Sequence, residues 1–175
     1  MNSKNFIFFI FYFLIFIALQ VIILRNVVLF NVAFCFFYVA FLLMLPLESG
    51  RITLLILGFL TGLVVDIFYD SLGIHAAACV LMMYLRPFWI NLITPRGGYE
   101  LEMRPTLFDM DFQWFGTYIF PLILIHHFAL FFIETGVINL FLFTGLKVIS
   151  STAFTFSTII IVQFLFFSAK RSSSI

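Results

Sequence analysis

The stretch that decides the fold is residues 58–75, which read GFLTGLVVDIFYDSLGIH. It begins as an apolar run typical of a helix and ends as a polar turn. Gly58, Gly62, Asp66 and Asp70 recur every four residues, so a helix places them on one slowly drifting stripe. The glycines leave room for a second helix to approach closely. The two carboxylates lie where that apolar face reaches the membrane edge. We therefore expect the residues that give the protein its specific contacts to lie along this stripe.

The composition is typical of a membrane protein. Of the 175 residues 64% are hydrophobic and only 10% are charged, whereas a soluble domain is roughly half apolar and a quarter charged. Such a chain lacks the polar surface to cover itself in water. Its 28 phenylalanines suit a surface that faces lipid. The net charge of +1 and the lack of a basic cluster argue against nucleic acid as a partner.

A transmembrane helix needs roughly 20 apolar residues, and the sequence contains several stretches of that length. We expect spans at about 6–24, 27–47, 52–69, 74–93, 114–133 and 148–167. Residues 94–112 form the one long polar loop, and residues 137–147 are either an interfacial segment or part of the last span. The sequence thus predicts an all-α integral membrane protein, a compact bundle of about six transmembrane helices that forms one polytopic domain over residues 1–175.

The charges of the predicted loops indicate an orientation. Six spans put both ends of the chain and the 94–112 loop on one side of the membrane. That side holds most of the basic residues, with Lys4, Arg51, Arg96, Arg104, Lys170 and Arg171 against Arg25 and Lys147 on the other side. By the positive-inside rule both termini are then cytoplasmic. Asp66, Asp70, His75 and Glu134 lie toward the outer face.

The two aspartates of the stripe have different interpretations. An ionisable group at membrane depth is a functional candidate, as a proton or ion relay or as the partner of a cation. For Asp66 we favour a buried, hydrogen-bonded or interface role over ion transport. Asp70 lies just past the span, where Asp and Ser commonly cap the next helix, so we favour a cap-and-turn role.

Three histidines lie in or beside the predicted spans. His75 opens the fourth span, and a lone histidine there is usually an amphipathic border residue. His126 and His127 occupy the middle of the fifth span. His127 shares a face with Glu134 but is two turns from it, about 10 Å, which is too far for one metal unless other helices contribute. Hydrogen bonding between helices is the favoured role, and no cofactor is expected.

Other polar groups in the apolar runs are expected to serve packing. Arg86 either extends to the headgroups or pairs with a carboxylate, and Pro87 beside it predicts a kink or an early helix end. Ser151, Thr155 and Thr158 form a small polar stripe that suits helix–helix contact. No catalytic motif is present, and the two cysteines, which lie in apolar runs, are read as buried thiols.

The 58–75 stretch resembles the MreD family, the membrane subunit of the bacterial rod-shape system. Members tend to carry a glycine-spaced helix that leads to an aspartate, then a short turn, Leu-Gly and a helix of small residues. Here the matching positions are Gly58, Gly62, Asp66, Leu72-Gly73 with His75, and the run Ala76-Ala77-Ala78. Chain length and the number of predicted spans also fit. Ser71 stands where many members have a proline, which leaves the geometry of the turn open.

The resemblance implies a non-enzymatic scaffold of the elongation machinery in the bacterial cytoplasmic membrane, which supports cell shape and peptidoglycan synthesis through protein contacts. Its implied partners are an MreC-like protein, an MreB-like filament, and a RodA-like polymerase with its transpeptidase. The 94–112 loop is the expected contact for cytoplasmic partners. The outer turn from Asp66 to His75, including Gly73, is the expected contact for MreC.

An alternative from another class is the substrate-binding S-component of an energy-coupling-factor vitamin transporter. Six short helices with little soluble mass also describe these proteins. Such a protein binds a vitamin in an outer pocket, for which Asp66, His75 and Glu134 are the candidate residues here. These proteins typically carry Ala-x-x-x-Ala on the first helix, whereas residues 6–24 hold a single alanine, Ala18. A proton-coupled transporter that uses Asp66 and His127 is a third reading, without the internal repeats that many transporters show.

Overall fold

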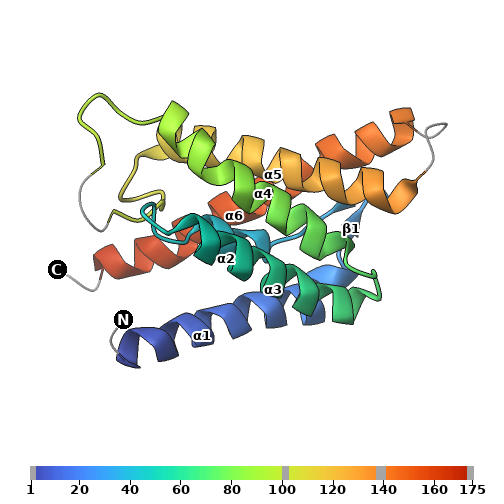
Figure 1. Cartoon of the computed structure of the whole chain (residues 1–175), viewed down its shortest axis with the longest axis horizontal. Coiled ribbons are helices and arrows are strands. Elements are labelled where there is room, and N and C mark those ends of the chain that lie inside the picture. The colour runs from blue at the N-terminus through green and yellow to red at the C-terminus, as the bar shows by residue number, and fades with distance from the viewer. Residues whose placement is uncertain (1–2, 100–102, 137–140, 173–175) are drawn as a thin grey trace.

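The structure, a computed structural model, describes residues 3–99, 103–136 and 141–172 and is mostly helical (Figure 1). The helices in chain order are α1 (Ser3–Ala18), the π-helix η1 (Leu19–Ile23), the 3-10 helix η2 (Leu24–Asn26), α2 (Val39–Leu43), α3 (Arg51–Tyr69), α4 (Ile74–Leu92), α5 (Phe112–Thr135) and α6 (Phe141–Ser172). Two short strands, β1 (Val28–Leu29) and β2 (Ala33–Phe34), pair antiparallel.

Four helical stretches of the described chain are long and apolar enough to cross a membrane. They are Phe9–Asn26, Arg51–Tyr69, Phe112–Thr135 and Phe141–Leu165. Helix α4 matches α3 in length but contains His75, Arg86 and Pro87 and is not among them. The helix continues through Pro87, so an early end there is not observed. A mostly helical, membrane-type architecture is therefore confirmed, whereas the six membrane helices of the prediction are not.

The predicted second span, 27–47, is wrong as a helix. Its chain forms the β1–β2 hairpin, an extended stretch and then the five-residue helix α2. The hairpin closes through a turn in which Phe30 and Asn31 both have positive φ, the pattern of a type I′ turn. From this hairpin the chain runs back along the bundle to α2 (Figure 1). The segment is apolar because it is buried inside the protein, where residues 35–43 form the centre of the core.

Side chains from distant helices hold this extended segment in place. The amide of Phe34 donates to Ser151 Oγ at 2.9 Å and the amide of Phe36 donates to Thr155 Oγ1 at 3.0 Å. Gln20 of the π-helix accepts from the Tyr38 amide at 3.3 Å and donates to the carbonyl of Cys35 at 2.9 Å. Non-helical backbone at membrane depth requires such internal partners. The Ser/Thr stripe thus contacts an extended segment as well as α5, which Thr155 reaches through His127.

Thr155→Val is expected to destabilise the protein by roughly 1 to 3 kcal/mol, because it leaves the buried amide of Phe36 without an acceptor in a site of unchanged shape. Thr158→Val is the matched control. Its hydroxyl donates at 2.9 Å to Phe154 O of its own helix and also contacts the Cys35 thiol, but it is not the acceptor of the Phe36 amide. SDS-unfolding titrations of both variants check the prediction, and equal effects would contradict it.

Helices α3 and α4 form the closest pair in the bundle. A Cβ built on Gly62 would lie 2.6 Å from the amide nitrogen of Ala76 and from the carbonyl oxygen of His75. A Cβ on Gly58 would meet Met83 Cγ at 2.9 Å and Cys79 O at 3.2 Å. The predicted packing role of both glycines is confirmed. The face they form is covered by α4 of the same chain, so it is not an open partner surface.

The ends of the helices sort into two groups (Figure 1). The N-terminal end of α1, the C-terminal end of α6 and the α4–α5 connection lie at one end of the bundle. The α3–α4 turn and the β-hairpin lie at the other end. Of the 137–147 segment, residues 141–147 belong to α6, whereas 137–140 lie outside the described residues.

Candidate functional site

Asp66 caps the first turn of α4 from across the hairpin. Its carboxylate accepts hydrogen bonds from the amides of His75 at 3.0 Å and Ala76 at 2.9 Å, and from the Ser71 hydroxyl at 2.6 Å. These amides belong to the N-terminal turn, which has no intrahelical acceptors and favours a negative charge. Asp66 is 5% exposed. The favoured hydrogen-bonded role is therefore confirmed, and the carboxylate closes the hairpin at the point where Gly62 brings the two helices together.

The turn after Asp66 has the left-handed backbone of a helix end. Asp70 has φ 57° and ψ 41° at the C-terminus of α3, and Gly73 has φ 94° at the start of α4. Leu72 lies between them and is fully exposed. The turn role of Asp70 is thus confirmed, but the cap of α4 comes from Asp66, so that part of the prediction for Asp70 is wrong.

Asp66→Asn is expected to lower the free energy of unfolding by roughly 1 to 2 kcal/mol, because an amide keeps one acceptor oxygen and loses the charge that favours the helix start. Asp70→Asn is the control within the same turn. Its side chain is exposed, and Asn also tolerates left-handed backbone, so no measurable change is expected. Thermal unfolding in detergent separates the two variants, and a larger effect at Asp70 would contradict the assignment of the cap.

Tyr38 is the centre of a buried polar cluster that joins the extended segment to α4 and α5. Its hydroxyl lies 2.8 Å from His75 Nδ1 and 2.8 Å from His126 Nε2, and Cys79 Sγ lies 3.7 Å away. Tyr38 and His126 are fully buried and His75 is 3% exposed. The border role predicted for His75 is therefore wrong. His75 lies in the first turn of α4, and its side chain points into the bundle rather than toward its edge.

One nitrogen of this cluster lacks a partner. A phenol has a single hydrogen, so Tyr38 donates to one imidazole and accepts from the other. Whichever direction holds, Nδ1 of His126 is buried with no hydrogen-bond partner among the described residues. His127, by contrast, uses both ring nitrogens, with Ile123 O at 2.8 Å and Thr155 Oγ1 at 3.2 Å. The predicted interhelical hydrogen bonding is confirmed for His127, which reaches α6, whereas His126 bonds to Tyr38 of the extended segment.

Arg86 is fully buried and holds the turn that follows α2. Its Nε donates to the Tyr118 hydroxyl at 2.6 Å, and its Nη atoms donate to the carbonyls of Leu45 and Pro46. Tyr118 in turn donates to Leu43 O at 2.7 Å. The predicted extension to the headgroups is wrong, because the side chain is fully buried, and among the described residues no carboxylate pairs with it. The carbonyls that a helix end leaves unpaired need donors, and the short helix α2 ends inside the bundle beside this side chain.

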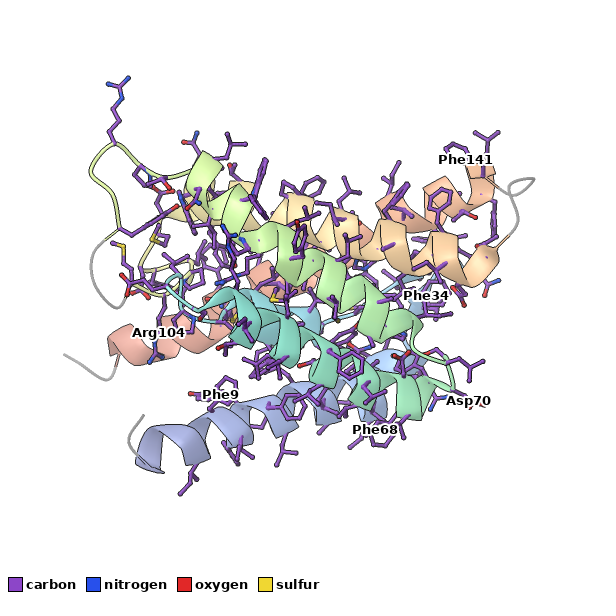
Figure 2. All side chains as sticks on the ribbon, in the orientation of Figure 1. Phe9, Phe34, Phe68, Asp70, Arg104 and Phe141 are labelled. Carbon is purple, nitrogen blue, oxygen red and sulfur yellow. The ribbon has the colours of Figure 1, made fainter. Side chains whose placement is uncertain are left out.

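A cavity of about 270 Å³ lies at the end of the bundle that holds the α3–α4 turn. Its walls combine aromatic rings of Phe34, Phe36, Tyr69 and Phe131 with polar groups of Asp70, Ser71, His75 and Glu134. Figure 2 shows Phe34 and Asp70 at this end of the molecule. The cavity brings together three of the residues that the sequence singled out, Asp70, His75 and Glu134. Asp66 is adjacent but is used by the helix cap.

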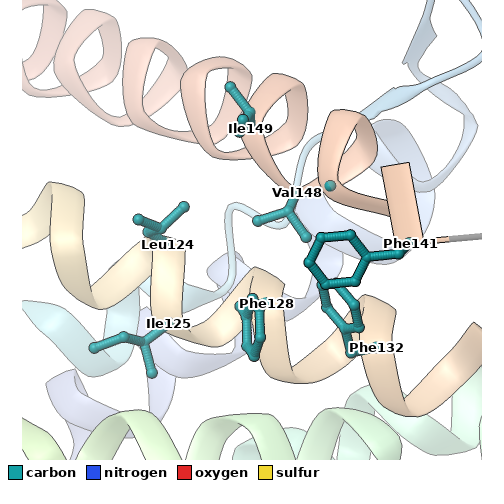
Figure 3. A pocket seen from close by; sticks show the side chains of 8 residues that line it. Leu124, Ile125, Phe128, Phe132, Phe141, Val148 and Ile149 are labelled. Atoms are coloured by element: carbon teal, nitrogen blue, oxygen red, sulfur yellow. The ribbon is translucent and has the colours of Figure 1, made fainter. Parts of the chain in front are cut away.

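A second, larger hollow of about 360 Å³ is purely apolar (Figure 3). It lies between α5 and α6, where Leu124, Phe128 and Phe132 face Phe141 and Val148. No polar group lines it, so it offers shape but no chemistry for a specific ligand. Among the described residues no group of three His, Cys, Asp or Glu side chains is placed to hold a metal ion.

Gln20 and Tyr38 have no place in the sequence-based expectations, and the buried hydrogen bonding of Tyr118 is not expected from its place near the start of the fifth predicted span. Gln20 is fully buried and its amide also donates to the Tyr69 hydroxyl at 2.7 Å. The sequence signal for a buried role of Gln20 is that it is a single amide side chain within an apolar run. Tyr38 and Tyr118 carry hydroxyls that must find partners when buried, but their positions in aromatic-rich runs hide them.

The chain was compared with known proteins in three ways. No family model, no curated protein and no solved structure matches it. The resemblance to the MreD family and the likeness to the S-component fold therefore stay predictions.

Proposed function

We propose that this chain is a non-enzymatic membrane scaffold of the bacterial cell-elongation machinery, in line with its resemblance to the MreD family. The observation that carries the proposal is the role of each residue in the 58–75 motif. Gly58 and Gly62 allow the close approach of α3 and α4, Asp66 caps α4, and Gly73 adopts the left-handed conformation of the turn. The motif thus serves to present one turn on a rigid hairpin, which is a task of recognition rather than catalysis.

The buried polar groups support the same reading. Asp66, Arg86 and His127 each bind backbone or hydroxyl groups of the chain itself. Such partners hold the bundle in one arrangement. A scaffold needs this rigidity, because a preorganised surface loses less entropy when a partner binds.

The exposed part of the motif is the proposed contact for an outer partner. Leu72 is fully exposed and follows the polar residues Asp70 and Ser71, and Phe30 at the tip of the β-hairpin is 93% exposed. Both lie at the bundle end opposite the two helical termini (Figure 1). With cytoplasmic termini this end faces outward, where an MreC-like protein would bind. The α4–α5 connection would face MreB-like and synthase partners.

The test is affinity purification of the tagged full-length chain from native membranes, read by mass spectrometry. Recovery of an MreC-like protein with a RodA-like polymerase and its transpeptidase is the expected result. Leu72→Glu is expected to reduce recovery of the MreC-like protein about tenfold while leaving the fold unchanged, since an anchor residue of an interface is commonly worth more than 1 kcal/mol. Cell width is expected to increase in the same strain.

Leu92→Glu is the matched control, because Leu92 is also an exposed leucine, 74% exposed, at the opposite end of the same hairpin. Recovery of the MreC-like protein is expected to match that of the unaltered chain. Purification of an ATPase with coupling subunits, or of a bound vitamin, would overturn the scaffold proposal. So would wild-type cell width together with unchanged recovery in Leu72→Glu.

A further inference from the structure

The cavity beneath the α3–α4 turn has a property that a scaffold does not require, because carboxylates line it and basic side chains lie against the aromatic rings of its walls. Asp70 and Glu134 are exposed carboxylates that line it from the turn and from α5. The guanidinium of Arg25 lies 5.2 Å from the ring centroid of Tyr69, which is a wall of the cavity. Lys147 Nζ lies 5.6 Å and 5.9 Å from the rings of Phe34 and Phe131, which are walls too.

Deeper groups add a site for a hydrogen bond. His75 lines the cavity, and only 3% of its surface is exposed. Its Nδ1 is occupied by the Tyr38 hydroxyl, which leaves Nε2 as the ring nitrogen available to a ligand. Because Tyr38 links His75 to His126, the imidazole is held in a single orientation. The cavity therefore has a fixed polar group at its wall and ring faces around it.

The balance of charges decides the class of ligand. A simple cation would be attracted by Asp70 and Glu134 but repelled by Lys147 and Arg25, and a simple anion would meet the reverse. A molecule with both charges satisfies both pairs at once, with its ammonium toward the carboxylates and its anionic group toward the basic side chains that lie beside the wall rings. The volume of about 270 Å³ suits a small head rather than an extended molecule.

We propose that this cavity binds a small zwitterion, an ammonium separated by a few bonds from a phosphate or carboxylate. The phosphoethanolamine headgroup of a lipid and a free amino acid or phosphoethanolamine share this chemistry. The site goes beyond the scaffold role and does not depend on it. A ligand there would contact the α3–α4 turn, β2 and α5 together.

Binding is tested on the purified full-length chain by isothermal titration with O-phosphoethanolamine and with L-alanine. The double variant Asp70→Asn/Glu134→Gln and the variant Lys147→Gln are each expected to weaken binding roughly fivefold or more, as expected for the loss of a charged contact. Glu48→Gln removes an exposed carboxylate from the 46–50 turn, outside the cavity lining, and is expected to leave binding unchanged. Ethylamine and ethyl phosphate, which each carry one of the two charges, are expected to bind at least about tenfold more weakly.

A second experiment, on the chain in lipid nanodiscs, distinguishes a lipid headgroup from a free zwitterion as the ligand. A lipid headgroup is supported if native mass spectra show that the chain retains phosphatidylethanolamine in preference to phosphatidylglycerol. This preference should be lost in the double variant. Binding of the free compounds without such retention supports a free zwitterion. The proposal is overturned if neither free compound nor phosphatidylethanolamine binds, if ethylamine binds as tightly as O-phosphoethanolamine, or if the cavity variants bind like Glu48→Gln.

Discussion

Gly62→Ala is expected to abolish stable folding or to lower the free energy of unfolding by at least about 3 kcal/mol, the upper range for overpacking. The added methyl group would lie 2.6 Å from backbone atoms of His75 and Ala76. Backbone of a helix start cannot rotate away as a side chain can. Relief requires the separation of α3 from α4, which also pulls the Asp66 carboxylate from the amides that it caps.

The other helical glycines supply a graded control. Gly58→Ala is expected to cost less, because its nearest contact is the flexible side chain of Met83. Gly145→Ala in α6 meets nothing within 4 Å and is expected to stabilise the chain by up to about 1 kcal/mol through helix propensity. Fluorescence-detected size exclusion after heating ranks the three variants. Equal stability of the Gly62 and Gly145 variants would contradict the packing of the hairpin.

Arg86→Met is expected to destabilise the protein by about 3 to 5 kcal/mol, because it removes at least two buried hydrogen bonds from a charged donor, each worth roughly 1.5 to 3 kcal/mol. The change leaves the carbonyl of Leu45 without its buried donor, whereas Pro46 O keeps its bonds from Ser49, and it removes the guanidinium that pairs with Tyr118. In a membrane interior water does not replace such donors. We expect the end of α2 to detach from α4, and cleavage between α2 and α3 by added protease to increase.

Tyr118→Phe is expected to cost less, roughly 1 to 3 kcal/mol, because it removes one hydroxyl and leaves the bonds from Arg86 to Leu45 and Pro46 intact. The double variant is expected to be less destabilised than the sum of the two single variants, since both residues serve the same helix end. Arg104→Met is the control, as an exposed arginine of the α4–α5 connection. Additive effects, or an equal loss in Arg104→Met, would contradict the role of Arg86 in the turn after α2.

The hairpin shows how much local pattern can predict. The spacing of Gly58, Gly62 and Asp66 predicts a stripe on one helix face, and the structure buries all three against α4. The turn at Asp70 and Gly73 follows from residue types that tolerate left-handed backbone. Such features depend on residues that are near in sequence. His75 illustrates the limit, because its contact with Tyr38 depends on where a distant segment lies.

The sequence by itself determined the apolar class of the chain and the α3–α4 hairpin, since both follow from composition and from spacing within one segment. Only the tertiary structure decided the path of residues 27–47 and the roles of Arg86 and Tyr38. Apolar length measures the preference of side chains for a non-aqueous environment, which lipid and a protein core satisfy equally. Whether such a segment becomes a helix depends on partners for its amides. Here those partners are Ser151 and Thr155, which lie more than a hundred residues away in the chain.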